Sequence, residues 1–146
     1  MNERAMAAAP ARDMTEKKHE RVALPRFEDA RGSLMFAEES RQIPFPVKRL
    51  FAIYEVPEGS TRGGHAHRAQ EQFLVMLAGG CTVIVDDGER RTEERLQRAV
   101  EGLYVPAGLW LELKDFSAGA VCVVLSSGLY DETDYIRNYR DFLACR

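Results

Sequence analysis

The sequence predicts one all-β domain that ends in a short helix. Short apolar runs follow one another from Arg21 onward and alternate with Gly, Pro and Asp clusters, a pattern typical of strands joined by turns in a barrel or sandwich. A length of 146 residues suits a single domain. Near the end, aromatic and aliphatic side chains recur at helical intervals and predict a short helix within 131–143. These side chains are Tyr135, Ile136, Tyr139 and Phe142.

The predicted strands lie between clear turn signals. A turn-like cluster at 28–32 separates the first two apolar runs, and Pro44 and Pro46 punctuate the link to the third. The Asp-Asp-Gly sequence at 86–88 predicts a hairpin, because glycine supplies positive φ. The charged stretch 89–98 is then interpreted as the solvated return strand and loop. The other expected strands are 21–25, 32–37, 47–56, 61–67, 71–77, 81–85, 102–105, 109–113 and 121–126.

Composition and charge exclude several classes of protein. A net charge of −3 offers no basic surface for nucleic acid, and no apolar run approaches the ~20 residues of a membrane-spanning helix. Residues 1–20 mix alanine with charge, so we expect a disordered tail before a domain that spans 21–146. Cys81 and Cys122 lie in apolar runs and are expected to be small core residues. Scattered cysteines in odd number, with no apolar signal core, favour a cytoplasmic location.

Two of the three histidines stand two residues apart in the stretch 61–72, directly after two glycines. If the segment is extended, His65 and His67 point to one face, because side chains at i and i+2 share a side of a strand. Glu71 is expected to join that side. The glycines allow the backbone to bend and leave room for a molecule to approach. Two imidazoles and a carboxylate on one inner wall indicate either a metal site or a proton-transfer site.

The spacing of Gly59, His65, His67, Glu71 and Gly79 resembles the first motif of the cupin family of small barrels. The second cupin motif, P-x-G-x-x-H, is similar to P-A-G-L-W-L at 106–111, so Leu111 stands where a metal-binding cupin has its fourth ligand. Three ligands are enough for an open metal site. The leucine, however, places an apolar wall against the ion, and we predict that no metal is bound.

A narrower resemblance rests on several strings in order, among them R-G-G-H-A-H at 62–67 and Y-D-E-T-D-Y-I-R at 130–137. Together they resemble the sugar 3,4-ketoisomerases, also described as WxcM-like C-terminal domains, over residues 25–143. These enzymes act on dTDP-4-keto-6-deoxyglucose in deoxysugar biosynthesis. The resemblance implies a small single-domain cupin, that is, a jelly-roll-like β-barrel. It also implies a metal-free homodimer with strand exchange between subunits.

The reaction implied by this resemblance moves a keto group from C4 to C3 of a nucleotide-linked 4-keto-6-deoxy sugar. The C3 hydrogen is weakly acidic beside the carbonyl, its removal gives an enediol(ate), and return of the proton at C4 leaves the ketone at C3. No electrons leave the substrate, so no cofactor is expected. A histidine, with a pKa of about 6.5, is a suitable base. The resemblance implies that His67 is the main proton shuttle and that His65 orients, polarises or assists.

Five further residues are candidates for binding the dTDP-linked substrate. Arg62 lies beside the histidine pair, and a guanidinium binds phosphate oxygens bidentately, although a surface ion pair is the alternative. Arg31 and Arg49 have the same two interpretations, and only the resemblance favours binding. Glu71 is expected to position a histidine or to pair with an arginine. Trp110 is expected either to stack on a base or sugar or to belong to the core.

Two positions depart from the ketoisomerase pattern. The family usually has W-H-E where this chain has Trp110, Leu111 and Glu112, and it favours tyrosine where Ala52 stands. Both Leu111 and Ala52 are expected near the pocket. Two rivals to the isomerase therefore stay open: a non-catalytic cupin that binds a sugar nucleotide, and a metal-dependent cupin enzyme.

Overall fold

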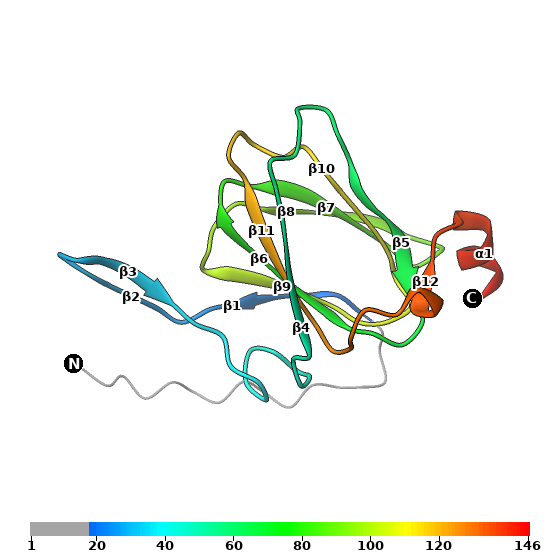
Figure 1. The fold of residues 1–146 in the computed structure, drawn as a ribbon, viewed down its shortest axis with the longest axis horizontal. Coiled ribbons are helices and arrows are strands. Elements are labelled where there is room, and N and C mark those ends of the chain that lie inside the picture. The colour runs from blue at the N-terminus through cyan, green and yellow to red at the C-terminus, as the bar shows by residue number, and fades with distance from the viewer. Residues whose placement is uncertain (1–17) are drawn as a thin grey trace.

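The computed structural model describes residues 18–146, which form two five-stranded antiparallel sheets packed face to face (Figure 1). The first sheet has the order β1-β9-β6-β11-β4, with bounds Glu20–Ala23, Glu101–Val105, Gln72–Ala78, Val121–Ser126 and Arg49–Tyr54. The second has the order β12-β5-β10-β7-β8, with bounds Tyr135–Ile136, Arg62–His67, Trp110–Lys114, Cys81–Asp86 and Arg91–Leu96. The predicted all-β fold is confirmed.

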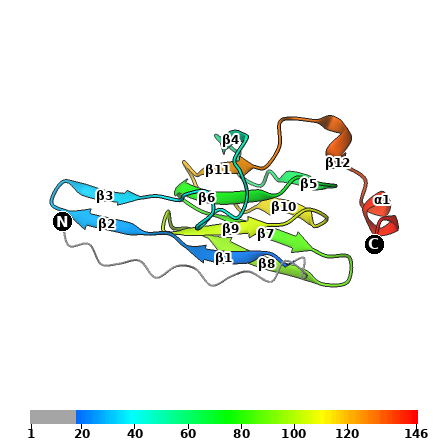
Figure 2. The same ribbon diagram turned by 90° about the horizontal axis from the view of Figure 1, so that it is seen from below.

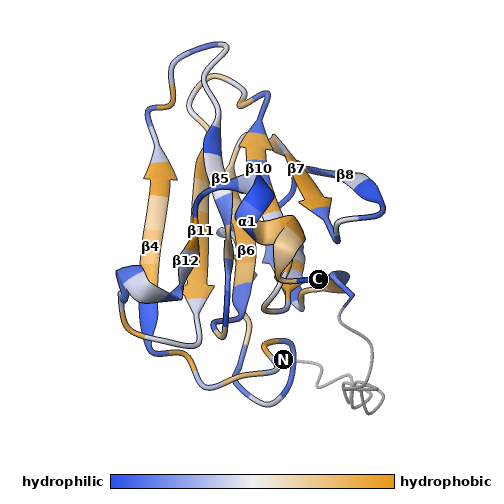
Figure 3. Ribbon diagram, turned by 90° about the vertical axis from the view of Figure 1, so that its right-hand side faces the viewer, coloured by the Kyte–Doolittle hydropathy of each residue, from blue (hydrophilic) through white to orange (hydrophobic). Residues whose placement is uncertain are grey.

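Apolar side chains from both sheets fill the space between them. β6, β9 and β11 contribute from one side, and β7 and β10 from the other. Figure 3 shows β4, β6, β7, β10 and β11 as mainly apolar, whereas β5 and β8 are mainly hydrophilic. Cys81 and Cys122 are fully buried in this core, as predicted. Burial of each large aliphatic side chain stabilises the fold by about 1.5–3 kcal/mol, so this core holds the two sheets together.

The jelly-roll-like arrangement is confirmed, although backbone pairing within residues 18–146 leaves two separate sheets rather than a closed barrel. The hairpin predicted at 86–88 joins β7 to β8, and Gly88 adopts the positive φ of 94° that the turn requires. The charged stretch after it forms β8. Its side chains alternate between exposed and half-buried positions, as expected for a solvated edge strand.

The C-terminal helix is shorter than the sequence predicts. A 3-10 turn at Glu132–Asp134 and the short strand β12 precede α1, which spans only Tyr139–Ala144. β12 pairs with the edge of β5, and this pairing takes its two residues out of the helix. Asn138 then begins α1, because its side-chain oxygen accepts hydrogen bonds from the free amides of the first turn. The helical spacing of the aromatic residues therefore misplaced the start of the helix.

A separate hairpin, β2 (Arg26–Asp29) and β3 (Gly32–Met35), extends away from the two sheets (Figures 1 and 2). The sequence placed a turn at 28–32, but β2 continues through Asp29 and the turn is shorter. Phe27 and Leu34 face each other across this hairpin and are 53% and 59% exposed. An isolated two-stranded hairpin is at best marginally stable in water. This arm, residues 26–35, therefore presents apolar surface that the rest of residues 18–146 leaves exposed.

The predicted N-terminal tail lies outside the described residues up to position 17. Within the remainder of that stretch, β1 already begins at Glu20, and the His19 ring nitrogen Nε2 lies 3.1 Å from a carboxylate oxygen of Glu94. None of the helices in residues 18–146 is long and apolar enough to span a membrane.

Candidate active site

Strand β5 carries both histidines, and its glycines set their position. Gly63 and Gly64 have φ values of 81° and 75°, which side-chain-bearing residues rarely adopt. A Cβ atom on Gly63 would lie 2.7 Å from the carbonyl oxygen of Leu111, so β5 approaches β10 closely at the bulge in their pairing. Beyond this bend, the rings of His65 and His67 are 5.1 Å apart between centroids and perpendicular. The structure thus brings the two histidines together, as the sequence predicts.

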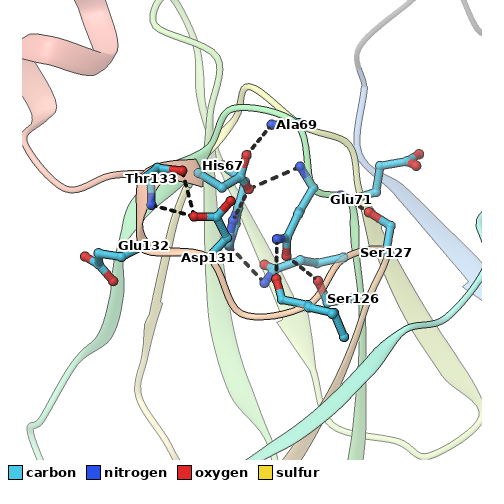
Figure 4. Close-up of polar contacts among 12 residues, drawn as sticks. His67, Ala69, Glu71, Ser126, Ser127, Asp131, Glu132 and Thr133 are labelled. Carbon is cyan, nitrogen blue, oxygen red and sulfur yellow. Dashed lines mark hydrogen bonds and ion pairs between the residues drawn. The ribbon is translucent and has the colours of Figure 1, made fainter.

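His67 is buried, and both of its ring nitrogens are engaged inside the protein (Figure 4). Nδ1 lies 2.9 Å from Oδ2 of Asp134, and Nε2 lies 3.1 Å from the amide nitrogen Nε2 of Gln72. Burial lowers the pKa of His67, while the hydrogen bond to Asp134 opposes that shift. His67 is therefore a ring held in place from both sides.

Asp134 anchors this arrangement from the 3-10 turn that precedes β12. Besides its contact with His67, its carboxylate accepts the backbone N–H of Ala69 at 2.8 Å and that of Gln70 at 3.3 Å. The Asp134 carbonyl also accepts the N–H of Arg68 at 2.8 Å. Through these hydrogen bonds, Asp134 holds the C-terminal segment against the bend that follows β5.

His65, in contrast, lines a cavity of about 380 Å³. Burial lowers the pKa of His65 to about 4, with a further contribution from the neighbouring ring of His67 and from Arg137. Its imidazole is therefore neutral near pH 7 and able to accept a proton. The ring of Tyr135 lies 4.9 Å from that of His65 and 4.4 Å from that of His67, so it closes one side of the pair.

Apolar side chains and polar or charged side chains both line the cavity. Side chains from both sheets contribute to it, together with the segment just before β5 and the segment that follows β12. The lining residues are Phe51, Ala52, Ile53, Thr61, Arg62, Gly63, His65, Gln72, Leu74, Leu111, Leu113, Val124, Tyr135 and Arg137. A concave pocket that combines apolar side chains with convergent polar groups is the usual form of a small-molecule site.

Two of the three predicted arginines belong to this region. Arg62 lines the cavity. Arg49 lies on β4 and donates a hydrogen bond of 3.1 Å to Gln70. Its positive charge contributes to lowering the pKa of His67. The Nε atom of Arg49 is buried and has no hydrogen-bond partner among residues 18–146. Arg31 lies far along the chain's projecting arm, where it is paired with Asp29 at 2.6 Å. Within one subunit, Arg31 is therefore not part of the site.

Glu71 does not join the histidines, in contrast to the expectation from strand periodicity. The chain bends after His67, so the alternation of side chains ends there, and the carboxylate of Glu71 accepts a hydrogen bond from the Tyr104 hydroxyl. Figure 4 shows the Glu71 side chain directed away from His67. Asp134 supplies the carboxylate instead. The string D-E-T-D-Y that contains it was visible in the sequence, but nothing local indicated that its last aspartate reaches the histidine strand.

Trp110 belongs to the core rather than to the cavity. It is 5% exposed and packs between Ala66, Ile136 and Phe142, with its indole N–H donating to Glu112 at 2.9 Å. Neighbouring residues of a strand face opposite sides, so Leu111 points into the cavity while Trp110 packs under the C-terminal helix. Of the two interpretations of Trp110, stacking on a ligand in this cavity is the one that the structure contradicts.

Leu111 and Ala52 both line the cavity, as the resemblance predicted. Leu111 pairs directly with His65 across β5 and β10, which places an aliphatic side chain beside the imidazole. With Glu71 turned toward Tyr104, no group of three His, Cys, Asp or Glu side chains suited to a metal ion occurs among the described residues.

Comparison with known proteins gives concordant matches. The family described as FdtA, WxcM-like, C-terminal matches residues 17–146. A TDP-4-oxo-6-deoxy-alpha-D-glucose-3,4-oxoisomerase from Aneurinibacillus thermoaerophilus is 48% identical over 114 residues, which are 78% of this chain and 82% of that protein.

Solved structures agree with the sequence match. A 3,4-ketoisomerase from Helicobacter canadensis has a TM-score of 0.86 and 36% identity, covering 89% of this chain and 98% of the other. The sugar 3,4-ketoisomerase QdtA from Thermoanaerobacterium thermosaccharolyticum, solved in complex with TDP, has a TM-score of 0.84 and 34% identity, covering 86% and 92%. Both similarities extend over most of this chain and nearly all of the other.

Proposed function

We infer that this chain, which belongs to the family of WxcM-like C-terminal domains, is a 3,4-ketoisomerase of a dTDP-linked 4-keto-6-deoxy sugar. The observation that carries the proposal is a neutral histidine on the wall of a sugar-sized cavity, backed by a second histidine that is fixed by a buried carboxylate. The relatives support the substrate class, because one is named for TDP-4-oxo-6-deoxyglucose and another was solved with TDP bound.

In the proposed mechanism His65 is the group that moves the proton. Its neutral imidazole removes the proton from C3, and the electrons of that C–H bond form the C3=C4 double bond of the enediolate while the oxygen at C4 becomes anionic. The proton of the C3 hydroxyl passes to this oxygen, so that C3 becomes the carbonyl, and the proton held by His65 or one from solvent is delivered to C4. The resemblance to the ketoisomerases implied His67 for this role. The engagement of both His67 nitrogens supports assigning His67 to a positioning role instead, with His65 as the base.

The charged groups at the cavity suit a sugar diphosphate. Arg62 and Arg137 both line it, and guanidinium groups bind phosphate oxygens bidentately. Arg137 is held over the ring of Tyr135, 4.3 Å from its centroid, and is paired with Glu132. We assign the diphosphate to these two arginines and retain Arg49 as a neighbour that adds positive charge near the reacting end.

The function is tested by NMR of the purified protein with dTDP-4-keto-6-deoxyglucose in D₂O. An isomerase incorporates solvent deuterium at C3 or C4 and produces the 3-keto sugar. Binding of dTDP without exchange would instead support the non-catalytic cupin. Activity that disappears on chelation and returns with a specific metal ion would support the metal-dependent alternative.

We also propose a homodimer in which the arm, residues 26–35, packs on the partner subunit. Its exposed Phe27 and Leu34, and its pairing as a two-stranded sheet separate from the other strands of residues 18–146, support this arrangement. Such an exchange would carry Arg31, at the turn of the arm, to the partner, where its predicted role in substrate binding becomes possible.

The free thiols of the three cysteines support the predicted cytoplasmic location.

The double substitution Phe27→Ser and Leu34→Ser is expected to convert the dimer to a monomer, because it removes the apolar surface that the partner would cover. Sedimentation velocity measures the change. Leu77→Ser, at another leucine that is about half exposed, is the matched control and should leave the dimer intact. A double variant that sediments as the wild type would contradict strand exchange through this arm.

A further inference from the structure

We infer that Gln72 is an additional catalytic residue, which donates one amide hydrogen to His67 and offers the other to the oxygen that becomes anionic in the substrate. The inference rests on the proposed function, since it names the group that stabilises the enediolate. It concerns a residue that the sequence did not single out, in the first position of β6.

The position of Gln72 is unusual for a glutamine. It is 4% exposed, although a buried amide is costly unless it is hydrogen-bonded, and it lines the cavity together with His65. Its amide nitrogen lies 3.1 Å from Nε2 of His67. Gln72 thus connects the buried His67 to the cavity, because its amide contacts the His67 ring and its side chain lines the cavity.

The chemistry of the neighbours determines which way the amide points. A carboxylate only accepts hydrogen bonds, so the 2.9 Å contact with Asp134 requires the proton of His67 to be on Nδ1. A neutral imidazole then has a bare Nε2, which needs a donor. The amide nitrogen of Gln72 meets that need, and its carbonyl oxygen would not.

The second hydrogen of the amide supplies the catalytic function. An amide nitrogen carries two hydrogens, and His67 takes only one of them. The other is available to an oxygen at the cavity wall, where His65 removes the proton from the adjacent carbon. A preorganised donor at such a position typically changes kcat by about 10²–10³-fold.

The donor orientation depends on His67 staying neutral. A doubly protonated His67 would present Nε2–H and would turn the amide so that its oxygen faces the ring. Asp134 favours the protonated ring, whereas burial and the positive charges of Arg49 and Arg137 oppose it. The neighbouring His65 is itself neutral near pH 7. The charges around the ring therefore keep Gln72 acting as a donor.

Two substitutions test the inference in the full-length protein. Gln72→Met keeps the volume but removes both hydrogens, and kcat for the 3,4-isomerisation should fall about 10²-fold while the affinity for dTDP stays within about threefold. Gln72→Glu replaces the donor by a carboxylate, and ¹⁵N NMR of the histidine rings should then show protonation of Nε2 in His67. Gln42→Met, at another buried glutamine outside the cavity, is the control for the cost of losing a buried amide.

The outcomes separate the inference from the function it rests on. A folded Gln72→Met variant with wild-type kcat, or a wild-type ¹⁵N spectrum with the His67 proton on Nε2, would overturn the inference while leaving the isomerase intact. A wild-type protein that gives no exchange at all would overturn the proposed function. A loss of kcat in Gln42→Met equal to that in Gln72→Met would mean that the effect is one of stability, and would also overturn the inference.

Discussion

Replacement of His65 by asparagine is expected to lower kcat for the isomerisation about 10²–10⁴-fold, because the general base on the cavity wall is removed. The affinity for dTDP should change little, since the nucleotide does not depend on this imidazole in the proposed arrangement. Deuterium incorporation at C3, followed by NMR, measures the chemical step directly. Thermal unfolding of the same variant checks that the fold is retained.

His67→Asn is the comparison that separates the roles of the two rings. An asparagine at this position can still occupy part of the space between Asp134 and Gln72, so some exchange should survive. If exchange persists fully in His65→Asn but vanishes in His67→Asn, the assignment of His67 as the proton shuttle, which the family resemblance implied, is the correct one.

The pH dependence provides a second view of His65. With a pKa of about 4, its neutral form persists well below the range of an ordinary histidine, so the acidic limb of kcat/KM should lie near pH 4 rather than 6.5. The same shift affects stability. The unfolded chain binds the His65 proton more tightly than the folded protein does. The contribution of His65 to the free energy of unfolding is therefore fully present above pH 6.5 and is lost as the pH falls toward 4. An acidic limb near 6.5 would contradict the assignment.

Replacement of Asp134 by alanine is expected to destabilise the protein by about 3–5 kcal/mol, since it leaves several buried donors without a partner. These donors are the ring N–H of His67 and the backbone N–H groups of Ala69 and Gln70. Chemical denaturation measures the free energy of unfolding. Activity should also fall, because His67 loses the group that fixes its tautomer.

Two further variants sharpen this prediction. Asp134→Asn keeps the shape but replaces one carboxylate oxygen by an NH₂ group, which is a donor and must then face another N–H group. The stability of this variant should therefore lie between that of the wild type and that of Asp134→Ala. Glu58→Gln removes an exposed carboxylate in a turn and should change the free energy of unfolding by less than about 0.5 kcal/mol. An Asp134→Ala variant as stable as this control would contradict the anchoring role.

Local patterns were sufficient for much of the fold. Apolar runs and turn residues predicted most strands and the hairpin after β7, because side-chain alternation and glycine conformations are local properties. They were insufficient for the C-terminal segment, where Tyr135 and Ile136 have helical spacing but pair with β5. The pairing partner stands far away in the sequence, and no local pattern reveals it.

By itself, the sequence determined the all-β class, the burial of the two core cysteines, the meeting of His65 with His67, and the presence of Leu111 and Ala52 at the pocket. The fold class and the buried cysteines follow from apolar runs and turn residues, and the meeting of the histidines follows from their spacing within one strand. The place of Leu111 and Ala52 follows from the resemblance to the ketoisomerases. Only the tertiary structure decided that Asp134 rather than Glu71 binds His67, that Trp110 is core, and that Gln72 joins the site. Each depends on which distant segments pack together, and the hydrophobic contacts and hydrogen bonds that select those neighbours form only when the whole chain folds.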